Sequence, residues 1–203
     1  MTCRAAVDLD IMVMIRPRGG DFVYSRRELD VMLSDIAFCR EAGVTGVVFG
    51  ALATDGSLAR SQVRSLVEAA GDMDVCFHRA FDVCADPFAT LEELVDLGVT
   101  RILTSGQQPT VPEGIPLIRK LVEQAADRIE ILPGCGINPD NVAGVVRSTG
   151  VTQFHATAFS RVTSPMQHRN DRVYMGLPGL PEYERELTDE AEVRRFMAAV
   201  SAG

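Results

Sequence analysis

The stretch MVMIRPRGGDFVYS, residues 12–25, places a short apolar run directly before a polar, glycine-rich turn. Residues 12–15 are apolar and too few for a helix, so they predict a buried strand. Arg16, Arg18 and Asp21 follow that strand closely. Because binding sites in proteins built from parallel strands lie where the strands end, this turn is the first candidate for a functional surface.

Length and composition restrict the class of protein. The 203 residues are 46% hydrophobic and 24% charged, which predicts one domain over residues 1–203 with one sizeable core. The formal net charge of −8 and the scattered basic residues argue against a nucleic-acid partner. We find neither a membrane-spanning apolar run nor a signal peptide, and therefore expect a cytoplasmic protein without a membrane partner.

Short apolar runs alternate with amphipathic helical patterns along the whole chain. Ser25 and Glu28 form a capping box, and Asp86-Pro87 marks another helix start. Gly-Val-Thr recurs at positions 43, 98 and 150, where each copy closes a helix and opens a strand. Six β/α units favour a TIM-type (β/α) barrel, although a doubly wound sheet would show the same local pattern. The predicted parallel strands are Ile11–Arg16, Gly46–Gly50, Val75–Arg79, Arg101–Ser105, Ile129–Leu132 and Thr152–His155.

The cysteines and lysines exclude several chemistries. Five cysteines without paired spacing predict neither a disulfide framework nor a zinc finger, so we expect reduced thiols. Lys120 is the only lysine and falls opposite the apolar stripe of its helix, which argues against a Schiff-base mechanism. The dinucleotide-binding pattern G-x-G-x-x-G is absent from the sequence.

Four stretches carry a family resemblance. IRPRGGDFVYS, FHRAFDVCADP, LTSGQ and SPMQHRN resemble, in order and spacing, the signature stretches of the CutC family, the copper homeostasis proteins. The resemblance runs from about Val7 to about Asn170. It implies a TIM-like barrel and a role in copper homeostasis, with copper(I) as the bound ion. It also implies that two β/α units are missing ahead of the strand that ends at Arg16, so we expect an incomplete barrel.

The missing units matter because the cysteines usually proposed as copper ligands in the family lie within them. A late start codon, a genuine truncation and closure by a partner chain would each explain their absence. Unpaired strand edges predict a homo-oligomer, and an inactive remnant is a third hypothesis for function.

Copper(I) favours soft thiolates, which leaves Cys84 and Cys135 near the predicted mouth as candidate metal ligands. Cys76 shares a strand face with His78, but we interpret it, like Cys39 and Cys3, as a small core or surface residue.

An enzyme that acts on a small anionic metabolite is the alternative. LPGCGIN (132–138) and FHATA (154–158) resemble the glycine-rich strand ends of phosphate-binding barrels. His78 and His155 would then be a general acid/base pair, with Asp82 orienting one imidazole. Guanidinium groups bind carboxylate or phosphate through two N–H groups. The predicted ligand-binding residues are Arg16, Arg18, Arg79, Ser105, Gly134, Gly136 and, through the family resemblance, Arg169.

The C-terminal part departs from the β/α alternation. Residues 159–188 predict an irregular lid or tail over the barrel mouth. Residues 189–202 predict a last helix, with an apolar face formed by Phe196, Met197 and Val200.

Overall fold

Five short strands form one parallel sheet in a computed structural model that describes residues 5–173, 176 and 181–201. The strand order follows the chain, so each strand pairs with the next one, as in a barrel. β1 is an edge of this sheet and pairs with β2 alone. The strands are β1 (Met12–Met14), β2 (Gly46–Phe49), β3 (Asp74–Phe77), β4 (Arg101–Thr104) and β5 (Glu130–Pro133).

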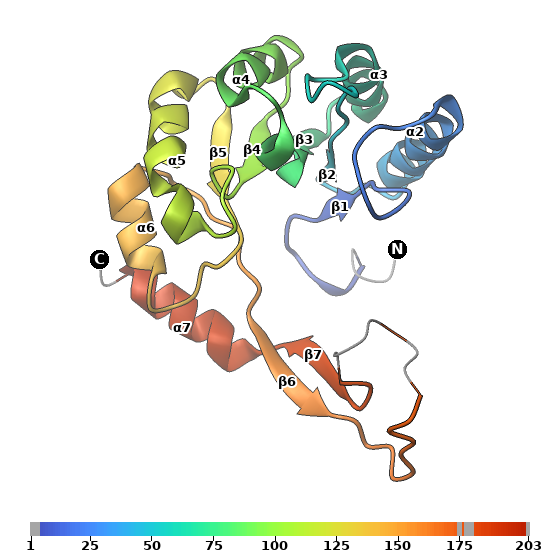
Figure 1. Ribbon diagram of the computed structural model, residues 1–203, viewed down its shortest axis with the longest axis vertical. Coiled ribbons are helices and arrows are strands. Elements are labelled where there is room, and N and C mark those ends of the chain that lie inside the picture. Colours follow the sequence, from blue (N-terminus) through green and yellow to red (C-terminus); the bar gives the residue numbers. More distant parts are fainter. Residues whose placement is uncertain (1–4, 174–175, 177–180, 202–203) are drawn as a thin grey trace.

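Helices follow the strands and lie along the outer side of the curved sheet (Figure 1). Ser25 accepts from the Glu28 amide and Glu28 accepts from the Ser25 amide, which confirms the predicted capping box. Gly43, Gly98 and Gly150 close their helices with φ values of +67°, +79° and +78°, which explains the repeated glycine. The helices are α2 (Arg26–Glu41), α3 (Arg60–Ala70), the 3₁₀ helix η1 (Arg79–Val83), α4 (Pro87–Asp96), α5 (Val111–Ala125) and α6 (Val142–Thr149).

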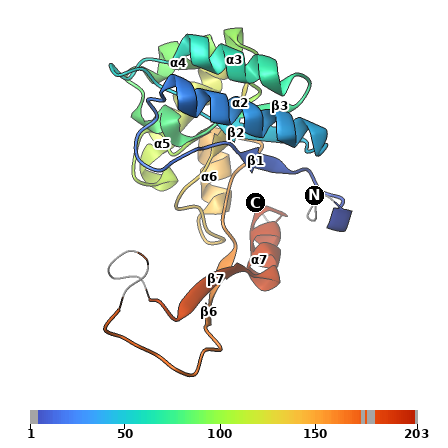
Figure 2. The same cartoon turned by 90° about the vertical axis from the view of Figure 1, so that its right-hand side faces the viewer.

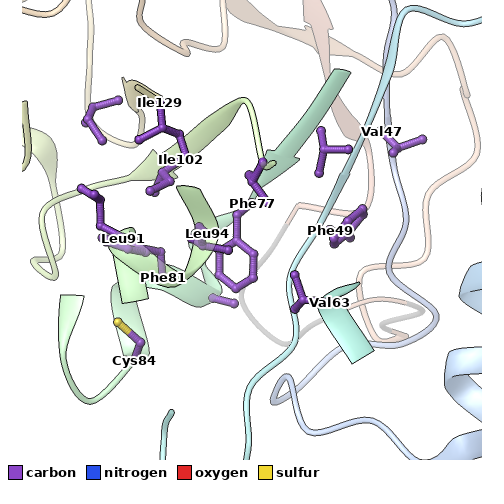
Figure 3. Close-up of a cluster of buried hydrophobic side chains, with 14 of the residues drawn as sticks. Val47, Phe49, Val63, Phe77, Phe81, Cys84, Leu91, Leu94, Ile102 and Ile129 are labelled. Atoms are coloured by element: carbon purple, nitrogen blue, oxygen red, sulfur yellow. The ribbon is translucent and has the colours of Figure 1, made fainter. Parts of the chain in front are cut away.

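The hydrophobic core lies between the sheet and these helices. Phe49 and Phe77 point from their strands toward the helices and are fully buried. Figure 3 shows them with Val63 of α3 and with Leu91 and Leu94 of α4. Since side chains alternate along a strand, the neighbours of these core residues face the inner side of the sheet.

The sixth predicted strand is reduced to a single contact. Residues 152–155 form one parallel bridge, in which His155 pairs with Gly134 and its amide donates to the Pro133 carbonyl at 2.8 Å. In the described part of the chain this segment has no partner on its other side, so nothing extends the pairing. The fold is thus the predicted incomplete TIM-type barrel, with five paired strands where six were expected.

The C-terminal part differs from the expected irregular segment. β6 (Phe159–Thr163) and β7 (Glu184–Thr188) pair as an antiparallel ribbon, and Figures 1 and 2 show it extending away from the five-stranded sheet. The first five and the last five residues of segment 159–188 pair with each other through backbone hydrogen bonds, which forms the ribbon. α7 (Glu190–Ser201) follows, and its Phe196 stacks on Phe154 at 6.0 Å between ring centroids. None of the described helices is long and apolar enough to span a bilayer.

Candidate functional site

His78 stands at the end of β3 in a closed environment. Its Nδ1 accepts a hydrogen bond from the Ala80 amide at 3.1 Å, and its ring centroid lies 4.9 Å from that of Phe22. Gly50 permits this packing, because a Cβ there would come within 2.6 Å of Nδ1. Burial lowers the pKa of His78 to about 4, so the ring is neutral near pH 7 and carries its proton on Nε2.

The side chain of Asp82 forms hydrogen bonds with the loop after β4. Its carboxylate accepts from the Arg79 guanidinium at 2.7 Å, from the Ser105 amide at 3.0 Å and from the Gln107 amide at 3.1 Å. The Thr104 hydroxyl also donates to it. The predicted role for Asp82, orienting an imidazole, is therefore replaced by a structural one. The strand-end residues Arg79 and Ser105 meet, as predicted, because Arg79 Nη2 donates to Ser105 Oγ at 2.8 Å.

The other three arginines that were predicted to bind ligand have different neighbours. Arg18 donates to Glu28 at 2.6 Å and to Asp21 at 2.9 Å, which raises its pKa and neutralises its charge locally. Arg169 stacks on Tyr183 at 5.1 Å, within the C-terminal segment that extends away from the sheet. Arg16 is exposed and donates from Nη2 to the Gly20 carbonyl at 2.9 Å.

The two predicted glycines serve packing and turn geometry. A Cβ on Gly134 would lie 2.6 Å from a Leu103 methyl and 3.1 Å from the His155 Cβ. Gly136 has φ +75°, which favours glycine, and a Cβ there would meet Thr110 at 2.8 Å. The predicted acid/base partner of His78, His155, lies on the inner side of the sheet, and burial lowers its pKa.

The two predicted copper ligands lie in different environments. Cys84 is 5% exposed and belongs to the core, where Figure 3 shows it beside Phe81. Burial raises its pKa, which disfavours a free thiolate. Cys135 is exposed and its thiol donates to the Pro109 carbonyl at 3.3 Å. Within residues 5–173, 176 and 181–201, no three His, Cys, Asp or Glu side chains are grouped so that they could hold a metal ion.

Two methionines that the sequence analysis passed over, Cys76, which it interpreted as a core or surface residue, and His155, which it predicted as an acid/base residue, line a cavity on the inner face of the sheet. This inner cavity has a volume of about 390 Å³. Cys76 and His155 reach it from β3 and from the segment after α6, while Met12 and Met14 reach it from β1. The alternation of Met12 with Met14 was the available signal, because a period of two places such residues on one face of a strand. Asp10, Thr45, Val48, Asp74, Arg101, Leu103, Leu132 and Gln153 complete the lining.

The sheet order and the polar strand ends define an α/β protein of the TIM-barrel type. The chain belongs to the CutC family, whose model matches residues 1–160, and this confirms the family resemblance; three of the four signature stretches lie within the matched residues. A family protein CutC of Parabacteroides distasonis is 48% identical over 190 residues, covering 93% of this chain and 78% of the relative. The human copper homeostasis protein cutC homolog is 44% identical over 196 residues, covering 96% of this chain and 72% of the human protein.

Solved structures agree on the fold. The crystal structure of CutC from Streptococcus agalactiae matches with a TM-score of 0.70 and 38% identity, covering 72% of each chain. A mandelate oxidase variant matches with a TM-score of 0.52 at 17% identity, covering 75% of this chain and 49% of the oxidase. The second likeness concerns the fold alone.

Proposed function

We propose that this chain binds copper(I) as cargo in the inner cavity, through Met12, Met14, Cys76 and His155. Copper(I) prefers soft sulfur ligands, and imidazole also suits copper. Relatives are named for copper homeostasis, which agrees with a copper cargo. The thiol, thioether and imidazole groups that line the cavity are donor types that this ion prefers.

The position of the Met12 sulfur carries the proposal. A Cβ on Gly46 would lie 2.5 Å from Met12 Sδ, so the thioether lies across β2 where glycine leaves room. Gly46 pairs in register with Asp74 of β3, and Cys76 follows Asp74 on the same face. The Met12 side chain therefore points along the inner face toward the strand that holds Cys76.

The register brings the other donors to the same face. Met14 pairs with Val48, and Val48 pairs with Cys76, so Met14 and Cys76 lie two strand spacings apart, roughly 10 Å between Cα atoms. Methionine is long and flexible, which lets its sulfur adapt to a bound ion. Met14 is 53% exposed, so the cavity is reachable from solvent.

Binding would displace the thiol proton of Cys76. Burial raises the pKa of Cys76 to about 11, while the neighbouring Arg101 guanidinium opposes this rise. The thiolate is the metal ligand, so ion and proton compete for the sulfur. Copper affinity should therefore increase with pH below that pKa.

The test is a copper(I) titration of the protein under reducing conditions against a chromophoric chelator. Cys76→Ala should abolish competition, and Met12→Leu and Met14→Leu should each weaken affinity roughly tenfold, about 1.4 kcal/mol. Leucine conserves the volume of methionine, which limits the effect on folding. Met32→Leu, at a fully buried position of α2, is the matched control and should leave affinity unchanged.

Cys84→Ala and Cys135→Ala complete the experiment. Loss of copper in either variant, with retention in Cys76→Ala, would contradict the inner-cavity site and favour the ligands predicted from the sequence. The absence of competition by the unsubstituted protein would reject copper binding altogether. The predicted self-association and cytoplasmic location stay predictions.

A further inference from the structure

Three buried polar side-chain atoms in the described part of the chain make no regular hydrogen bond: His78 Nε2, the Tyr24 hydroxyl and Gln62 Oε1. The Tyr24 hydroxyl lies next to the Arg16 side chain, which is its nearest polar neighbour. His78 and Tyr24 are each only 4% exposed. Since buried polar groups are almost always hydrogen-bonded, the His78 and Tyr24 atoms indicate a missing partner.

Arg16 lies close to both side chains. Its guanidinium carbon is 4.8 Å from the centroid of the Phe22 ring, and that ring contacts the His78 ring. Burial raises the pKa of Tyr24, and the charges of Arg16 and Arg18, together with the contact between Arg16 and the Tyr24 hydroxyl, oppose this rise. Burial lowers the pKa of His78, and the charge of Arg16 acts in the same direction. The three side chains are therefore electrostatically coupled.

The positive charge of Arg16 is not neutralised within the described part of the chain. Arg18 and Arg79 pair with carboxylates, whereas Arg16 has no carboxylate within ion-pair distance there. The side chain of Arg16 is also exposed, so a ligand can reach it from solvent. An exposed cation whose charge acts on a buried hydroxyl and a buried imidazole is an arrangement suited to an anion.

We propose that Arg16, Tyr24 and His78, here called the Arg16 cluster, bind a small oxyanion, namely a carboxylate or phosphate group. The guanidinium can only donate, and His78 can only donate from Nε2 because Nδ1 already accepts from the Ala80 amide. The Tyr24 hydroxyl can supply a third donor. A carboxylate or phosphate is complementary because its oxygens only accept, and bonds to ionised groups are the strong ones.

The test follows the imidazole nitrogens of metal-free protein by NMR while inorganic phosphate or acetate is added. The chain has three histidines, so His155→Gln and His168→Gln assign the His78 signals. Saturable movement of the His78 Nε2 signal is expected with at least one anion. A shift with phosphate alone would identify a phosphoryl ligand, and a shift with acetate alone would identify a carboxylate ligand. Shifts with both anions would show that the site recognises the oxyanion chemistry that they share.

Two variants separate binding from folding. Tyr24→Phe removes a hydroxyl that lies beside Arg16 without a regular hydrogen bond, so it should change the free energy of unfolding little and weaken anion binding roughly tenfold. Arg16→Gln should abolish saturable binding. Arg26→Gln is the control, because Arg26 is 82% exposed and pairs with Asp30, and it should bind like the unsubstituted protein.

Three results would overturn the proposal. An equal shift with chloride would show a salt effect, and an undiminished shift in Arg16→Gln would place the ion elsewhere. No movement with phosphate or acetate would mean that water alone satisfies the two buried atoms. Because the experiment contains no copper, its outcome is independent of the inner cavity.

Discussion

The guanidinium of Arg79 lies 2.7 Å from a carboxylate oxygen of Asp82, whose side chain is only 6% exposed. This ion pair is the centre of a network, because the same carboxylate accepts backbone amides from the loop after β4. The network holds the ends of β3 and β4 together. Removing the carboxylate would leave several buried donors without an acceptor.

Asp82→Ala should therefore lower the free energy of unfolding by roughly 1–3 kcal/mol, because buried donors such as the Ser105 amide would lose their acceptor. Asp21→Ala is the matched control, because Asp21 is 72% exposed and solvent screens its pair with Arg18, so this pair should contribute little to stability. Urea unfolding followed by circular dichroism measures both. Equal losses would show that the Asp82 network is unimportant.

Gly46 should not tolerate a side chain. A Cβ there would come within 2.5 Å of the Asp74 carbonyl oxygen, which belongs to the backbone and cannot turn aside. Gly46→Ala should cost roughly 1–3 kcal/mol, the usual range for overpacking. Gly144→Ala, in the first turn of α6 with open space around it, should instead stabilise the protein by up to about 0.5–1 kcal/mol. Thermal or urea unfolding distinguishes the two, and a neutral Gly46→Ala would contradict the packing.

Cys135 adopts a backbone conformation that favours glycine. Its φ is +95°, and residues with a Cβ are disfavoured there. Cys135→Gly should therefore be more stable than Cys135→Ala by about 1 kcal/mol, since both variants remove the thiol and only one relieves the backbone. Comparison of their urea midpoints is the measurement. Equal midpoints would mean that the turn is not strained.

Stability should fall between pH 7 and pH 5 because of His78. Its pKa of about 4 in the folded protein lies below the ordinary value near 6.5, so between these values the unfolded chain binds more protons. The free energy of unfolding should drop on the order of 1–2 kcal/mol over this interval. Urea unfolding at the two pH values measures the drop.

His78→Asn should remove much of this pH dependence, because asparagine does not titrate and its amide oxygen can replace Nδ1 as acceptor. The lowered pKa of His155 contributes to the remainder. His168→Asn is the control, since His168 is exposed, and it should keep the full dependence. If His78→Asn also keeps it, His78 is not the titrating group.

Much of the fold could be predicted because its signals are local. The capping box of Ser25 and Glu28 depends on residues three positions apart, and the glycines at 43, 98 and 150 end helices through their own φ angles. The sixth strand was the exception. A strand needs a partner on its flank as well as an apolar pattern, and residues 152–155 make only one bridge.

The site could be predicted in part. The sequence correctly placed Arg79, Asp82 and Ser105 at neighbouring strand ends, since parallel strands end on the same edge of a sheet. It assigned Asp82 the wrong partner, because the amides of Ser105 and Gln107 are more than twenty residues away and reach it only through the pairing of β3 with β4. Tyr24 gave no signal, since a missing hydrogen bond is a property of the folded environment.

The sequence by itself determined the β/α alternation, the helix ends, the polar strand ends and the family, because all of these depend on residue order and short spacings. Only the tertiary structure decided which side chains meet. The register between strands placed the Met12 sulfur over Gly46 and directed it toward β3. Burial left the His78 Nε2 atom without a partner. Both results arise from contacts between distant segments, whose geometry is set by packing of the whole sheet rather than by any local pattern.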